Sequence, residues 1–162
     1  MIIKASVFKA IFILLVGGAL ILVLFLRFWA KPDVARTVLA TYDGFVSIGK
    51  TNIPVSIADT EATRELGLSG TTSLTKGSGK LFIFPRPDKY GFWMKDMKYS
   101  LDLVWIDAAF RIVDVTKNAT PASYPNVFYA KEPVLFVLEV NSDESEALNL
   151  IPGTTVTITK NE

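Results

Sequence analysis

The fold is decided by residues 80–115, which read KLFIFPRPDKYGFWMKDMKYSLDLVWIDAAFRIVDV. This stretch holds four short apolar runs separated by residues that favour turns. β-Branched and aromatic side chains are enriched in strands, whereas Pro, Gly, Asp and Ser interrupt them. We therefore predict four strands of an antiparallel sheet, over residues 80–85, 90–95, 101–106 and 111–115.

The preceding part of the chain predicts a hairpin and one short helix. Residues 45–57 hold two runs with alternating apolar positions, separated by the turn sequence Gly-Lys-Thr-Asn. Asp59 or Thr60 can cap a helix that begins near Glu61. That helix should stop at Gly67, since glycine is the usual residue just past a helix end.

The following part of the chain adds a long loop and two more strands. We expect a loop over about residues 118–133, a strand over 134–140, a short helix over 143–148 and a last strand over 154–159. Strands this short and closely spaced indicate a mostly β, or β-rich α+β, domain. We predict a compact barrel-like or sandwich-like antiparallel sheet with one or two short helices.

A hydrophobic segment precedes the folded part. Residues 10–26 contain no charged or strongly polar side chain. A helix of this run spans about 25 Å, near the lower limit for crossing a bilayer. The aromatic pair Phe28 and Trp29 suits the membrane interface and lets the helix extend to about residue 29. We predict an uncleaved signal anchor, with a cleaved signal peptide as the alternative, although no good small-residue cleavage site follows.

The chain is therefore expected to divide into an anchor over residues 1–31, a linker over 32–43 and a single β-rich domain over 44–162. A short, positively charged N-terminus ahead of one hydrophobic segment usually stays inside the cell. We accordingly expect a single-pass membrane protein with its domain outside the cytoplasm. If the signal is cleaved, the domain is secreted or periplasmic instead.

Composition excludes several kinds of chemistry. The 17 basic and 16 acidic side chains nearly cancel, so no strong field favours nucleic acid, and we predict no nucleic-acid partner. The absence of Cys and His removes disulfides, thiolate nucleophiles, imidazole catalysis and the usual zinc sites. We predict neither a metal nor a cofactor.

Glu139 is the most informative single residue, because it is a carboxylate inside an otherwise apolar strand. An unpaired buried charge is costly, so this group must have a cation, hydrogen-bond donors or a bound proton. One interpretation is a structural ion pair with Arg64 or Lys95. The other is a group that serves binding or catalysis.

Asp102 lies similarly between two leucines, and it either caps a turn or joins Glu139. Trp93 shares one strand face with Lys95, where it either packs in the core or offers a stacking surface beside a cation. The candidate polar cluster at the rim of the sheet consists of Arg64, Trp93, Lys95, Asp102 and Glu139.

An ordered set of short motifs resembles the prokaryotic family called domain of unknown function 192. The resemblance covers about residues 51–159, and its most distinctive part is Phe92-Trp93-Met94-Lys95 followed by Leu101-Asp102. It implies a compact β-rich fold, often behind a signal or anchor, in a bacterial or archaeal membrane, and it brings no established activity. The sequence departs from the family pattern at Asp96 and Ser100, where asparagine and proline are usual, and it lacks the family's methionine-x-arginine continuation after the helix. The motifs that carry the resemblance are residues 57–61, 64–68, 79–84, 92–95, 101–103, 137–139 and 150–153.

The leading functional hypothesis is a non-catalytic, membrane-tethered binding or accessory domain for a small polar ligand, a glycan or an envelope partner. A rival hypothesis is a hydrolase or lyase that uses Glu139 and Asp102 as paired carboxylates, with Lys95 or Arg64 stabilising negative charge. A third is a structural subunit of a membrane complex, which a large exposed apolar patch would indicate.

Overall fold

Nine strands and two short α-helices make up the part of the chain that the computed structural model describes, residues 42–161. The mostly β fold that we predicted is confirmed. Within residues 42–161, no helix is both long and apolar enough to cross a membrane. The predicted anchor helix at about residues 10–29, and the linker up to residue 41, lie outside the described residues.

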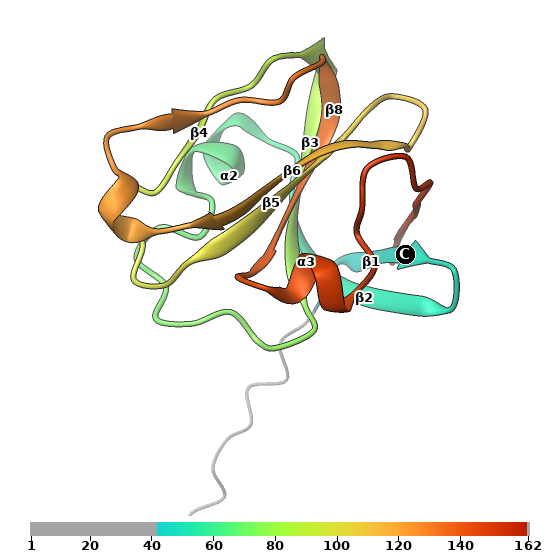
Figure 1. Ribbon diagram of the computed structural model, residues 1–162, viewed down its shortest axis with the longest axis horizontal. Helices are drawn as coiled ribbons and strands as arrows, with labels where there is room; N and C mark the ends of the chain where they lie inside the picture. The colour runs from blue at the N-terminus through green and yellow to red at the C-terminus, as the bar shows by residue number, and fades with distance from the viewer. Residues whose placement is uncertain (1–41, 162) are drawn as a thin grey trace, which may run out of the picture. The chain divides into compact units, whose positions relative to one another are not determined.

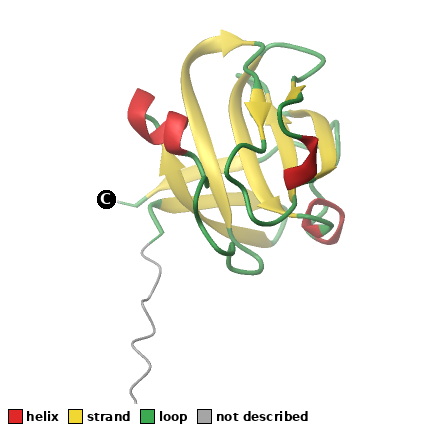
Figure 2. Ribbon diagram, turned by 90° about the vertical axis from the view of Figure 1, so that its left-hand side faces the viewer, coloured by secondary structure: helices red, strands yellow, loops and turns green. Residues whose placement is uncertain are grey.

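Seven of the strands form one curved sheet, in the order β6-β5-β8-β3-β2-β1-β9 (Figure 1). The remaining two, β4 and β7, pair with each other in a small second sheet. Figure 2 shows that strands dominate the folded part and that the short helices lie at its periphery. The strands of the large sheet are β1 Gly44–Ile48, β2 Thr51–Ala58, β3 Gly79–Asp88, β5 Leu101–Ile106, β6 Ile112–Ala119, β8 Val134–Asn141 and β9 Thr157–Lys160.

The sheet is mixed and open, which corrects two expectations. Strands β2 and β3 pair in parallel, because the helix and loop between them carry the chain back to the same end of the sheet. The barrel that we considered does not close, since β6 and β9 stand at opposite ends of the strand order. Within residues 42–161, a short contact joins the two edges through backbone hydrogen bonds from Ile112 N to Thr154 O, from Gly153 N to Ile112 O and from Val156 N to Phe110 O.

Both faces of the central strands are buried, and each face has its own hydrophobic core. All six residues of β5 are buried. Val104 and Ile106 of β5 belong to the first core, which lies against the β1–β2 hairpin, whereas Leu103 and Trp105 belong to the second. This alternation follows from the period of two in a β-strand. A residue's place in β5 or β8 therefore decides which core it enters.

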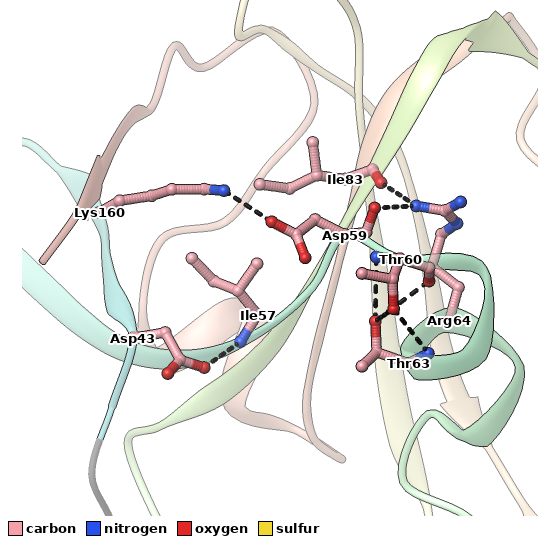
Figure 3. A network of polar contacts seen from close by, with 8 residues as sticks. All are labelled: Asp43, Ile57, Asp59, Thr60, Thr63, Arg64, Ile83 and Lys160. Atoms are coloured by element: carbon pink, nitrogen blue, oxygen red, sulfur yellow. Dashed lines mark hydrogen bonds and ion pairs between the residues drawn. The ribbon is translucent and has the colours of Figure 1, made fainter.

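The predicted helix is confirmed as α2, Glu61–Leu66, with Gly67 after its last residue. Thr60 and Thr63 form a reciprocal capping box at its start. One guanidinium nitrogen of Arg64, Nη1, donates to the carbonyl oxygens of Asp59 and Ile83, as Figure 3 shows. Arg64 therefore fastens the helix to the end of β2 and to β3.

The second core is covered by the small sheet of β4, Phe92–Trp93, and β7, Val127–Phe128. Figure 1 shows β4 and α2 on one side of the long strands, away from the β1–β2 hairpin. The ring of Phe92 makes edge contacts with Phe82 and Trp105, with centroids 4.9 and 5.5 Å apart. The strand predicted over residues 90–95 is thus shorter than expected and leaves the main sheet.

Near the C-terminus, two elements differ from expectation and one is confirmed. The predicted long loop contains β7 and a 3-10 helix, Pro121–Ser123. The predicted short helix is confirmed as α3, Glu144–Ala147. The last strand begins later than predicted, because residues 153–156 turn aside to contact the start of β6 before β9 pairs with β1.

Candidate functional site

A cavity of about 620 Å³ opens on the side of the sheet that carries the second core. Its walls come from α2 and the turn after it, from β3, and from the segment around β4. Aromatic side chains dominate these walls, and charged side chains stand among them. The aromatic lining residues are Phe82, Phe84, Tyr90, Phe92 and Trp93, and the charged ones are Arg64, Glu65, Lys95, Asp96 and Glu139.

Glu139 reaches this cavity from β8, an inner strand of the sheet between β5 and β3. It lies between Lys80 of β3 and Leu103 of β5 in the strand register. Only 6% of the residue is exposed. Within residues 42–161, its Oε2 is the one buried side-chain oxygen or nitrogen that has no hydrogen-bond partner. The sequence correctly identified Glu139 as an unusual carboxylate.

Burial raises the pKa of Glu139 from 4.5 to about 8, and the positive charge of Lys80 offsets part of that rise. The desolvation penalty falls on the ionised form, so the proton stays on the carboxyl group at neutral pH. Glu139 therefore presents a neutral carboxylic acid, which both donates and accepts hydrogen bonds.

The predicted ion pair of Glu139 with Arg64 or Lys95 is wrong. Among residues 42–161, no cationic nitrogen lies within 4.0 Å of its carboxylate. Arg64 is held by two backbone carbonyls and stands over the ring of Phe84, 5.5 Å from the centroid. Lys95 is exposed. Both residues line the cavity, but neither compensates the buried acid.

Asp102 lies on the opposite face of the sheet. It pairs in register with Val140, one residue past Glu139, so its side chain enters the first core. Its carboxylate accepts hydrogen bonds from Asn118 N at 2.8 Å, from Ser145 N at 3.2 Å and from Ser145 Oγ at 2.6 Å. Asp102 thus ties β5 to the end of β6 and to α3, and the two carboxylates do not share a cleft.

Trp93 lines the cavity with 56% of the residue exposed. Tyr129, exposed to the same extent, does not line the cavity but packs beside Gly91, which does. A Cβ atom on Gly91 would lie 2.7 Å from Val127 Cγ1 and 3.0 Å from Tyr129 Cε1. The missing side chain of Gly91 therefore lets Tyr129 pack beside the rim. We call Trp93, Gly91, Val127 and Tyr129 the aromatic stripe.

The sequence missed Tyr129, because we placed it in a loop with no partner. The sequence feature that could have indicated a neighbour here is Gly91, two residues before Trp93. Its missing side chain leaves room for Tyr129 on that face of the strand. The sequence also did not bring Tyr90 and Phe84 into the site, although their rings stack with centroids 3.5 Å apart in the cavity wall. Across residues 42–161, acidic side chains do not gather into a group of three that could hold a metal ion.

Comparisons with known proteins agree with this architecture. A model of the family DUF192, described as Uncharacterized ACR, matches residues 45–158. A crystal structure of a protein of unknown function from Novosphingobium aromaticivorans DSM 12444 is 28% identical, with a TM-score of 0.65, and the match covers 70% of this chain and 83% of that chain. A protein from Sinorhizobium meliloti 1021, provisionally described as a transcription regulator, is 27% identical, with a TM-score of 0.68, covering 74% of this chain and 96% of that one. No curated protein matched the chain.

We predict that Asp102→Ala destabilises the domain by about 3 to 5 kcal/mol, because it leaves the buried N–H and O–H of Ser145 and the partly buried N–H of Asn118 without their acceptor. Urea denaturation of the full chain measures the change. Asp88→Ala is the control, since Asp88 is an exposed acid and its loss should change the unfolding free energy by less than about 0.5 kcal/mol. A loss of less than about 1 kcal/mol for Asp102→Ala would contradict the structural role.

We further predict that Glu139→Gln becomes more stable than the wild type as the pH rises. The folded state holds the Glu139 proton more tightly than the unfolded state, so the stability from that proton is full below pH 4.5 and lost as the pH passes about 8. The variant should gain about 3 to 5 kcal/mol relative to wild type between about pH 4 and about pH 9. Urea titrations across this range test it, with the exposed Glu132→Gln as control. Parallel pH profiles for wild type and Glu139→Gln would show that the acid is not buried as described.

Proposed function

The chain belongs to the DUF192 family, and from that premise we propose that its folded domain is a non-catalytic module that binds a small polar ligand. The ligand enters the aromatic-walled cavity and contacts Glu139 at its inner wall. The same module is held at a membrane by the hydrophobic segment that precedes it.

One observation carries this proposal: Glu139, whose buried Oε2 has no hydrogen-bond partner within residues 42–161, lines a cavity of binding size. Buried polar groups in folded proteins are almost always hydrogen-bonded, so an exception calls for an explanation. Ligand cavities are typically about 300 to 1,000 Å³, mostly apolar, with a few polar groups that orient the ligand. The cavity around Glu139 has this size and this composition.

The geometry weighs against the rival enzyme. Acid–base chemistry with paired carboxylates requires both groups in one cleft, at roughly 5 to 10 Å from each other across the substrate. Glu139 and Asp102 point into different cores, and Asp102 is engaged by three hydrogen bonds. The described residues therefore offer no site for the mechanism that we considered.

The exposed aromatic residues bear on the third hypothesis, a structural subunit. An exposed apolar patch in place of a cavity would favour that role. Here the exposed residues Trp93 and Tyr129 adjoin the cavity and extend its rim. A patch that continues a cavity is better suited to a ligand that protrudes from it than to a flat subunit interface.

The proposed location outside the cytoplasm is supported by the sequence. Residues 10–26 lack charged side chains, and the positive residues Lys4 and Lys9 precede them. A module that is tethered in this way meets ligands close to the membrane surface.

We predict that small polar compounds stabilise the full chain through this cavity. A thermal-shift panel of sugars, polyols, amino acids and quaternary amines should contain at least one class that raises the midpoint, because a ligand of the native state stabilises by mass action. Ser69→Trp, which fills the cavity wall, should abolish the shift, and Ser47→Trp, on β1, should retain it. If no class shifts the wild type, or if the shift persists in Ser69→Trp, the cavity is not the binding site.

We also predict that the protein stays at full length in the membrane fraction and that protease added outside the cell removes its folded domain. The measurement is immunoblotting of fractionated and protease-treated cells, with a cytoplasmic protein as the control. A mature protein that starts near Lys31 or later would indicate a cleaved signal. Protection of the domain in intact cells would reverse the proposed orientation.

A further inference from the structure

We propose that the ligand is an uncharged oligosaccharide, with one sugar in the cavity against Glu139 and the next sugars on the aromatic stripe. This inference rests on the proposed function, because it names the ligand class of the same cavity. The juxtaposition that carries it is a cavity lined by the carboxyl group of Glu139 and by aromatic side chains, next to exposed aromatic residues that pack beside Gly91 of the cavity wall.

The charges around the cavity favour a ligand without net charge. Arg64 and Lys95 line the cavity with positive charge, and Glu65 and Asp96 line it with an equal number of negative charges. Because burial keeps the proton on Glu139 at neutral pH, this residue does not disturb the balance. A ligand of either sign would therefore meet no compensating field.

A cationic ligand is disfavoured next to Glu139 for a further reason. To pair with this residue, the cation would have to displace its proton. Lys80 already stands beside this residue on the neighbouring strand, and Arg64 lies in the cavity wall. A third cation near the same carboxylate would be repelled by both.

A sugar ring matches the remaining groups. Its C–H face can stack on an aromatic ring, and its hydroxyl groups both donate and accept hydrogen bonds. A neutral carboxylic acid offers the complementary pair, because its O–H donates and its carbonyl oxygen accepts. A hydroxyl-bearing ring in the cavity thus supplies a hydrogen-bond partner for the carboxyl group of Glu139, which lines the cavity and is 6% exposed.

The aromatic stripe indicates a ligand that is longer than one sugar. Trp93 and Tyr129 are each 56% exposed, and Val127 pairs with Trp93 across the small sheet, two residues before Tyr129. Gly91 and Trp93 belong to both the stripe and the cavity wall. A chain of sugars can therefore leave the cavity and continue over exposed aromatic rings without crossing a charged barrier.

Protonation of Glu139 gives this binding a defined pH dependence. If the acid form binds the sugar, affinity is full at neutral pH and falls as the pH rises through about 8. Burial raises the pKa of Tyr99 above its ordinary value of 10.0, so its phenol does not titrate in this range. The titratable and charged groups that face Glu139 are Lys80 on β3, Tyr99 before β5, Arg64 and Glu65 on α2, and Lys95 and Asp96 after β4.

The test is isothermal titration of the purified full chain with neutral and charged oligosaccharides. The neutral probes are chitotetraose, cellotetraose and maltotetraose, and the charged probe is the glucosamine tetramer, which has the skeleton of chitotetraose but carries amines. We expect at least one neutral tetramer to bind and the glucosamine tetramer to bind more weakly. Trp93→Ala and Tyr129→Ala should each weaken binding by about tenfold through lost stacking. Phe110→Ala, an exposed aromatic residue outside the cavity, is the matched control and should leave the affinity unchanged.

The pH arm separates the two ligand classes. For a neutral sugar, wild-type affinity should fall by about tenfold from about pH 7 to about pH 9, because the binding-competent acid form falls by that factor. Glu139→Gln should lose this pH dependence, and Glu139→Leu should lose binding, with thermal midpoints confirming that both variants fold. An affinity for amines that rises with pH would overturn the inference and leave the binding module intact. The oligosaccharide inference is also overturned, and the proposed binding function retained, if no neutral tetramer binds while another compound class stabilises the protein through the cavity. If no class binds in the cavity, the proposed function itself fails.

Discussion

The structure depends on one constraint, the burial of β5 and β8 on both of their faces. Because successive residues of a strand point to opposite faces, neighbouring polar residues in these strands enter different cores. Asp102 enters the first core, where three donors satisfy it. Glu139 enters the second core, where its Oε2 has no partner within the described chain. The same alternation that builds two cores therefore separates a structural acid from a candidate binding acid.

Local patterns in the sequence predicted most of the elements but not their arrangement. The caps of α2 and the runs of β1, β2, β5 and β8 are encoded within a few residues, so period and turn chemistry suffice. The parallel pairing of β2 with β3 and the open edge of the sheet depend on contacts between distant segments. The register that sets Leu103 opposite Glu139 is also non-local, and it alone determines that Asp102 faces away.

The site was predicted in part for the same reason. Trp93 and Lys95 both line the cavity, but β4 ends at Trp93 and Lys95 lies in the turn that follows, so the predicted strand alternation does not explain their common position. Arg64 was expected to neutralise Glu139, but the end of β2 and the middle of β3 present carbonyls that engage it first. Every residue carries a backbone carbonyl, so the sequence does not indicate which carbonyl oxygens will accept hydrogen bonds from Arg64. Tyr129 likewise joins the stripe because β7 pairs with β4. This pairing involves two residues of each strand, which is too short a run to be predicted from the sequence pattern.

An acid without a partner is tolerated at this position because it stays neutral. An ionised carboxylate buried without a cation would cost several kcal/mol, and the fold avoids that cost by keeping the proton. What remains is the loss of a hydrogen bond, about 1 to 3 kcal/mol. A ligand that hydrogen-bonds to Glu139 would gain the free energy of the missing hydrogen bond on binding. A side-chain partner within the protein would have gained it during folding, and the carboxyl group would then contribute little to ligand affinity. The groups that could have served as partners, Arg64 and Lys95, are held by carbonyls or exposed at the rim. Under the proposed function, the carboxyl group of Glu139 is the preorganised contact for the ligand, and the hydrogen bond that the fold leaves unmade contributes to the affinity.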